Sequence, residues 1–163
     1  MVQNLLLIFM VLLCILLILS IFRKPFDSKR NPCKFKVQSP KYSIEGNTKT
    51  ASFNIIVEKR HRYFINFPLL FKFYAHERFK TYVKITYITP GEEEPQILFD
   101  RIVEYTSKVK EHIVYITDVI MGKITIEVSI ESSYGDPIIG FEIMENSTCE
   151  LTKEHKLELK FPK

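Results

Sequence analysis

The sequence contains no tryptophan, only five glycines and only three cysteines in 163 residues. The absence of tryptophan excludes the Cys…Trp…Cys core that is typical of antibody domains. The few glycines form no phosphate-binding loop, and neither a CxxC motif nor a GxSxG motif occurs. None of the four histidines has a metal-ligand spacing; they are His61, His76, His112 and His155. We therefore predict a chain that is not an enzyme and holds no metal or cofactor.

Strong net charge is absent as well. The formal net charge is +4, which is too small to predict a nucleic-acid partner. Apolar residues make up 46% of the chain and charged residues 26%, a composition typical of a folded domain rather than a disordered tail. Phenylalanine and tyrosine are abundant, with 13 and 8 residues, and aromatic residues favour strands.

The first 22 residues carry no charged side chain. The apolar run from Leu5 to Phe22 would measure ~27 Å as a helix, close to the ~30 Å hydrocarbon core of a bilayer. A cleaved signal peptide would have a basic start, a shorter apolar run and small residues before the cut. Here the start is uncharged, the run is longer, and Ser20 with Ile18 two positions before it is a poor match. We predict an uncleaved transmembrane helix over residues 1–22, a basic linker over 23–33 and one domain over 34–163.

The side of the membrane that carries the domain is predicted differently by two sets of residues. The cations that follow the run favour the cytosolic side by the positive-inside rule; they include Arg23, Lys24, Lys29, Arg30, Lys34 and Lys36. The sequon at Asn146 and a candidate disulfide between Cys33 and Cys149 favour the lumenal or extracellular side. We favour the cytosolic side slightly, because charge acts directly on insertion.

Alternation with period two dominates the rest of the chain. It is clearest in 79–88, 123–131 and 155–161, where apolar and polar side chains take turns. Weaker strands are expected at 34–38, 51–58, 62–66, 69–74, 96–104, 112–117 and 138–144. The Pro- and Gly-containing segments 89–95 and 132–137 predict hairpin loops, and 100–112 fits either a helix or a strand followed by a loop.

This pattern predicts an all-β domain, an antiparallel β-sandwich of Ig-like or jelly-roll type with about 8–10 strands. The order of an N-terminal span, "KFKV", "ASFNIIV" and "GKITIEV" resembles late-embryogenesis type-2 transmembrane sandwich proteins, although their Asn-Pro-Asn motif is missing after "FNIIV". The segment "GKITIEVSIES" followed by "DPIIGFEI" is similar to the last strand pair of carbohydrate-binding jelly rolls. Both resemblances imply a sandwich fold, and they assign no activity.

Two surface features have a plain and a functional interpretation. The basic segment Lys59, Arg60, His61 and Arg62 is either a solvated turn or, together with Arg23, Lys24, Lys29 and Arg30, a contact to an anionic surface. The apolar segment 66–74 is a strand buried on both faces, a bulged strand or a partner patch; the candidate patch residues are Phe67, Leu70, Phe71 and Phe73.

These features favour a single-pass membrane protein whose sandwich binds protein partners or assembles a membrane complex without catalysis. The alternative is a sandwich that binds a glycan or a lipid on an aromatic face; that face would be built from Tyr82, Tyr105, Tyr115 and Tyr134. A membrane-tethered enzyme is favoured least, because it would need histidines and carboxylates clustered in a cleft.

Overall fold

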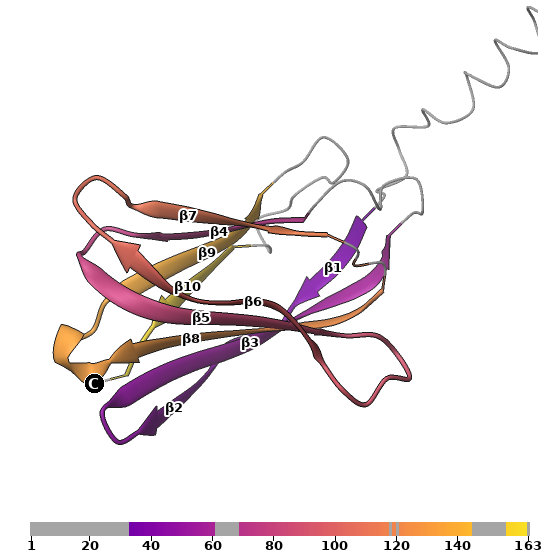
Figure 1. The fold of residues 1–163 in the computed structure, drawn as a ribbon, viewed down its shortest axis with the longest axis horizontal. Coiled ribbons are helices and arrows are strands. Elements are labelled where there is room, and N and C mark those ends of the chain that lie inside the picture. Colours follow the sequence, from indigo (N-terminus) through magenta and orange to yellow (C-terminus); the bar gives the residue numbers. More distant parts are fainter. Residues whose placement is uncertain (1–32, 61–68, 118, 120, 145–155, 163) are drawn as a thin grey trace, which may run out of the picture. The chain divides into compact units, whose positions relative to one another are not determined.

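The computed structural model describes residues 33–60, 69–117, 119, 121–144 and 156–162. Ten strands in two antiparallel sheets make up most of this part (Figure 1). The strands are β1 (Cys33–Val37), β2 (Lys41–Glu45), β3 (Thr48–Arg60), β4 (Leu69–Ala75), β5 (Phe79–Ile88), β6 (Gln96–Tyr105), β7 (Glu111–Ile116), β8 (Gly122–Glu131), β9 (Ile138–Met144) and β10 (Lys156–Lys160). The predicted antiparallel all-β class is therefore confirmed for the described residues.

Several predicted features lie outside the described residues. They are the strand at 62–66, the sequon at Asn146, Cys149 and the apolar run from Leu5 to Phe22. Among the helices of the described part, none has the length and apolar character needed to cross a membrane.

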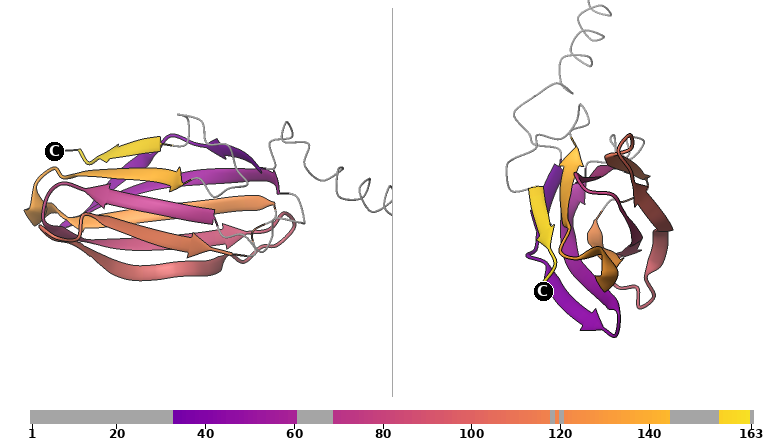
Figure 2. Two further views of the ribbon diagram at one scale, coloured as in Figure 1. Left: turned by 90° about the horizontal axis from the view of Figure 1, so that it is seen from above. Right: turned by 90° about the vertical axis from the view of Figure 1, so that its left-hand side faces the viewer.

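The strands are divided between a first sheet with the order β1-β3-β8-β5-β6, in which β2 also pairs with β3, and a second sheet with the order β10-β9-β4-β7. Figure 2 shows the two sheets as two layers of strands. Three pairs are nested within one another along the chain: β5 with β6, β4 with β7, and β3 with β8. The chain therefore crosses between the sheets at nearly every connection in the middle of the domain.

One predicted loop has a different role in the structure. The segment 89–95 joins the paired strands β5 and β6, so the predicted hairpin is confirmed. The segment 132–137 instead leads from β8 in the first sheet to β9 in the second, so the hairpin predicted there is wrong. The reason is that β9 pairs with β4, a strand more than sixty residues earlier, which the local turn residues cannot indicate.

The outer edge of the first sheet consists of β1 and β2 placed end to end along β3. Val37 lies opposite Ile55, and Lys41 lies opposite Ser52, so both strands keep nearly the same register. The residues between them include Pro40, which cannot donate a backbone hydrogen bond. This edge is therefore interrupted in its middle.

The core lies between the two sheets and follows from the alternation. In β3, β4, β5, β8 and β9, alternate side chains are buried, as the sequence pattern predicts. Phe141 on β9 is fully buried, and its ring centre lies 5.0 Å from that of Phe53, 5.5 Å from Phe71 and 5.2 Å from Phe73. Since Phe53 belongs to the first sheet and the other rings to the second, Phe141 joins the two layers.

The core also contains a buried lysine. Lys49 points inward from β3 and is only 7% exposed. Its ammonium group lies 3.0 Å from the Asp136 carboxylate and donates to the Gly135 carbonyl oxygen at 3.3 Å. A buried ammonium needs such partners, so this pair fixes the connection between β8 and β9 against the first sheet.

Candidate functional site at the open side of the sandwich

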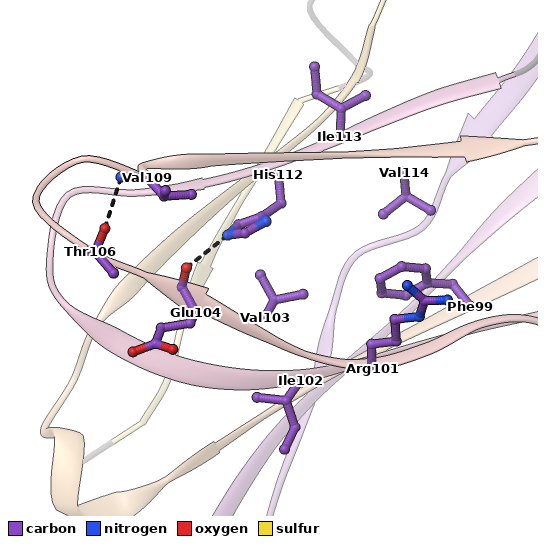
Figure 3. A pocket seen from close by; sticks show the side chains of 10 residues that line it. All are labelled: Phe99, Arg101, Ile102, Val103, Glu104, Thr106, Val109, His112, Ile113 and Val114. Carbon is purple, nitrogen blue, oxygen red and sulfur yellow. Dashed lines mark hydrogen bonds between the residues drawn. The ribbon is translucent and has the colours of Figure 1, made fainter.

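The strands β6 and β7 form the edges of the two sheets on one side of the sandwich, and a groove of about 450 Å³ lies between them (Figure 3). Phe99, Arg101 and Val103 of β6 line it from one side, and His112 and Val114 of β7 from the other. A short loop closes it at one end. Thr106 Oγ1 in this loop accepts hydrogen bonds from the backbone N–H groups of residues 108 and 109, at 3.2 and 2.9 Å. The segment 100–112 is therefore a strand followed by a loop and not a helix.

The polar groups of the groove are held by their neighbours. The His112 Nε2 lies 2.9 Å from the Glu104 carbonyl oxygen and donates to it, and the His112 ring stands edge-on to Tyr105 at 5.1 Å. The Arg101 guanidinium lies over the Phe99 ring at 6.0 Å. The lining of the groove is thus mostly apolar and also includes one cation, Arg101, and one acid, Glu104. This composition suits an apolar side chain, with an acid only beside Arg101.

The Tyr105 hydroxyl is a buried polar group beside the groove. The residue is 1% exposed, and its hydroxyl has no hydrogen-bond partner within the described residues. Burial raises the pKa of Tyr105, so the phenol stays neutral over the physiological range. No cluster of three or more metal-ligating side chains occurs in the described part of the chain.

The outer face of the second sheet carries a row of alternating charges. Lys72 on β4 binds Glu111 at 2.9 Å and Glu142 at 3.5 Å, and Glu142 also binds Lys156 at 3.0 Å. Beside this row, apolar side chains meet at one corner of the sheet; Leu70 lies directly opposite Tyr115 and Met144. This apolar corner consists of Leu70, Ile113, Tyr115 and Met144, and Tyr115 is 65% exposed.

The charge row shifts the pKa values of its members in opposite directions. The hydrogen bond from Lys156 holds the pKa of Glu142 below its usual value of 4.5, and Lys72 acts in the same direction. The hydrogen bond to Glu111 raises the pKa of Lys72 above its usual value of 10.5. The carboxylate contributes stability above pH 4.5 and loses it as the pH falls through its lowered pKa. The ammonium contributes below pH 10.5 and loses it as the pH rises through its raised pKa.

We therefore expect Glu142→Gln to lower the free energy of unfolding by about 0.5–1 kcal/mol at pH 7, because the row is only partly screened by solvent. The difference from the wild type should vanish below the lowered pKa of Glu142, where the carboxyl group is protonated. Urea unfolding followed from pH 2 to 8 measures this. Glu158→Gln is the matched control, since its pair with Lys160 is exposed, and it should cost nothing measurable. A loss at Glu142 that is independent of pH would contradict the assignment.

The predicted partner patch needs a correction. Phe71 and Phe73 are fully buried in the core, and Leu70 is half-buried on the outer face. Strict alternation in β4 turns Phe71 and Phe73 inward, so the prediction that they contact a partner is wrong. Phe67 lies outside the described residues. Of the patch residues that the structure describes, only Leu70 belongs to an exposed apolar cluster, the apolar corner.

The predicted aromatic face is not formed either. Tyr82 points outward from β5 in the first sheet, whereas Tyr115 is exposed on the second sheet. Tyr105 is buried in the core, where its ring and that of Tyr134 both pack on Phe79, at 5.0 and 6.1 Å. The four tyrosines belong to different layers of the sandwich, so they do not make one stacking surface for a glycan.

The remaining predicted site residues are only partly described. The backbone of Cys33 in β1 lies opposite that of Arg60 in β3, and Lys34 lies opposite Lys59. The partners that the predictions give to these residues lie outside the described part; they are Arg23, Lys24, Lys29, Arg30, Arg62, Asn146 and Cys149. The disulfide, the glycosylation and the contact to an anionic surface therefore stay predictions.

The residues that line the groove were not predicted from the sequence; they include Arg101, Ile102 and His112. One signal was present: in 96–105 apolar residues occupy both faces of the strand, so that Ile102 is apolar and 71% exposed. An apolar residue on the solvent side of a strand indicates an edge or an interface. No protein-family model matches the chain, and a search of curated proteins finds no match.

Proposed function

We propose that this chain is a single-pass membrane protein whose β-sandwich is a non-catalytic module that binds protein partners or assembles a membrane complex. The observation that carries the proposal is β6, a ten-residue edge strand on which Ile97 and Ile102 are 61% and 71% exposed. Unpaired strand edges with exposed apolar side chains are surfaces on which other chains dock. The uncharged run from Leu5 to Phe22 supports the membrane anchor.

We infer further that the sandwich is Ig-like rather than of jelly-roll type. In an Ig-like sandwich the strands are divided between the two sheets as ABED and CFG. The orders β1-β3-β8-β5 and β4-β9-β10 match this division when these seven strands are taken in chain order as A to G. The strands β6 and β7 are then an insertion between strands D and E, and they extend the two sheets beyond β5 and β4.

The interaction module is tested by site-specific photo-crosslinking of the full chain in its own membrane. We expect a cross-linker at Ile102 to capture a discrete partner, and the same group at Ile44, which is also exposed but lies on β2, to capture none. The membrane anchor is tested in the same preparation, because an integral protein stays in the pellet after alkaline carbonate extraction. Release by carbonate would overturn the anchor, and a chain that captures no partner at either position would overturn the interaction module.

We place the domain on the cytosolic side, because the six cations between Arg23 and Lys36 follow the apolar run and only one acid, Asp27, lies among them. We expect Asn146 to carry no glycan. In sealed vesicles whose cytosolic face is turned outward, we expect a thiol reagent added outside to label both Cys33 and Cys149. Glycosylation at Asn146, or a mobility shift caused by reductant, would place the domain on the other side.

A further inference from the structure

We propose that the open edge of β6 binds an extended segment of a partner protein, as an added antiparallel strand in which two cationic side chains flank an apolar one. This inference deepens the proposed interaction function and rests on it. It names the surface, the conformation of the partner segment and the charges that the segment carries.

Within the described residues, no strand pairs with β6 on the side away from β5, and His112 donates to the Glu104 carbonyl there. The Glu104 carbonyl points away from β5, because it accepts the hydrogen bond from His112 (Figure 3). In an antiparallel strand the N–H and C=O groups of one residue point to the same side, and successive residues alternate. The backbone groups of Ile102 and Asp100 therefore also face the open edge.

The other edges of the two sheets are less suited to strand addition. The edge formed by β1 and β2 is interrupted at Pro40. The strand β10 has five residues and carries Lys156 and Lys160, and β7 has six residues. Short strands, lysines and prolines are the usual protection of a sheet edge. By contrast, β6 has ten residues and contains neither lysine nor proline.

The charges on the outer face of the first sheet specify the partner. Along one row, Glu127 on β8 lies opposite Lys84 on β5, which lies opposite Asp100 on β6. In the parallel row of Lys80 and Glu104, the ammonium lies 3.9 Å from the carboxylate. Both rows alternate in sign and end on an acid at the open edge. A partner strand added to β6 continues this alternation if it carries a cation opposite Asp100 and another cation opposite Glu104. The side chain between them, opposite Ile102, is then apolar.

The groove specifies the other face of the partner segment. The side chains of β6 that point toward the groove are those of Phe99, Arg101 and Val103. In a strand added to β6, the side chains opposite these three residues therefore also lie beside the groove. Apolar groups fit beside Val103 and Phe99, and an acid fits beside Arg101. Because the segment runs antiparallel to β6, its first residue lies opposite Glu104 and its last opposite Phe99. Read from its N-terminus, the segment therefore has the pattern cation, apolar, apolar, acid, cation, aromatic.

A second copy of the same chain is a poorer occupant of this edge. A two-fold pairing centred on Ile102 would place Asp100 opposite Glu104 of the second copy, twice in each dimer. A pairing centred on Arg101 would place two guanidinium groups opposite each other. Like charges directly opposite one another destabilise a strand pair. The edge therefore favours a different chain with complementary charge.

The test uses the full chain in detergent micelles and two fluorescent hexapeptides with blocked termini, KVIEKF and its charge-exchanged partner EVIKEF. We expect KVIEKF to bind about tenfold more tightly than EVIKEF. Each of its three charges lies opposite a side chain of unlike charge on β6, whereas each charge of EVIKEF lies opposite one of like charge. The double variant Asp100→Lys, Glu104→Lys should reverse the order of the two peptides. Hydrogen exchange should show slower exchange at the amides of Asp100 and Ile102 when KVIEKF is bound.

Two further variants test the strand geometry. Ile102→Pro removes an N–H group that faces the open edge and no bond to β5, so it should reduce binding about tenfold or more while the circular dichroism spectrum is retained. Ile102→Lys should weaken KVIEKF binding by repulsion, whereas Ile44→Lys, the same change at an exposed isoleucine on β2, should leave it unchanged.

The possible outcomes separate this inference from the proposed function. Equal binding of both peptides, or equal binding to the wild type and Ile102→Pro, would overturn the β6 site. If a cross-linker at Ile97, which is also exposed on β6, captures the same partner in the wild type and in Ile102→Pro, the interaction module stands and only the added strand fails. A wild-type dimer on size-exclusion chromatography that Ile102→Lys converts to a monomer would identify a second copy as the occupant and overturn the charge pattern.

Discussion

Replacing Phe141 with alanine is expected to lower the free energy of unfolding by about 4 kcal/mol. The side chain is fully buried, and its ring contacts one phenylalanine of the first sheet and two of the second. Alanine would leave a cavity between the layers, where the strands on both sides are held in two paired sheets and cannot collapse inward. Typical domains are stable by about 5–15 kcal/mol, so this loss is a large part of the total.

Urea unfolding of the full chain, followed by tyrosine fluorescence and circular dichroism, measures the effect. Phe141→Leu is the control that keeps most of the volume, and it should cost about 1–1.5 kcal/mol. Phe79→Ala tests the position, since Phe79 lies among Tyr105 and Tyr134 and away from the central rings. A cost at Phe141 no larger than that at Phe79 would show that the layers are not joined there.

Replacing Gly122 with alanine is expected to cost about 3 kcal/mol, for two separate reasons. The backbone φ at Gly122 is 148°, a conformation that side chains other than glycine rarely adopt. A Cβ atom at this position would also lie 2.4 Å from the Ile88 carbonyl oxygen, which belongs to the backbone and cannot swing away. Gly122 begins β8, the central strand of the first sheet, so the clash would push this end of β8 away from the end of β5 at Ile88.

Gly91→Ala separates these two reasons. Its φ of 92° is also unfavourable for alanine, but no atom lies within 4 Å of the added Cβ. We expect Gly91→Ala to cost about 1 kcal/mol, so the difference between the variants measures the close approach of β8 to Ile88. Urea midpoints of the two variants give this difference directly. Equal losses at Gly91 and Gly122 would contradict the contact with the Ile88 carbonyl.

Much of the fold could be predicted from the sequence, because it depends on neighbouring residues. In 79–88 and 123–131 the apolar side chains at alternate positions are the ones that the structure buries. The loop at 89–95 was also predictable, since proline and glycine indicate a turn within a few residues. These local patterns determine which segments form strands and which face of each strand is buried.

The pairing of the strands could not be predicted in the same way. The sequence around 132–137 has the residues of a hairpin turn, but whether β9 continues the first sheet or joins the second depends on β4, which is distant in the sequence. The inward orientation of Phe71 and Phe73 could not be predicted either. An apolar run permits burial on one face or both, and only the strands packed on each side of β4 decide which face is the core.

The candidate site was missed for a related reason. Ile102 is exposed because β6 is the last strand of its sheet, and the position of a strand in a sheet is set by pairings between distant segments. His112 contacts the Glu104 carbonyl because the two sheets approach each other at that edge. The apolar residues on both faces of 96–105 were a visible sign, but a central strand would show the same pattern.

The nested pairing of β3 with β8 has a consequence for the synthesis of the chain. Phe79 and Tyr105 are 26 residues apart and can pair soon after both have emerged from the ribosome. Thr48 can pair only after Glu131 has been synthesised, 83 residues later. At typical elongation rates the 71 residues between Arg60 and Glu131 take roughly 4–14 s to synthesise. During this interval the apolar side chains at alternate positions of 51–57 lack their β8 neighbour, so β3 presents a second unpaired edge on the nascent domain.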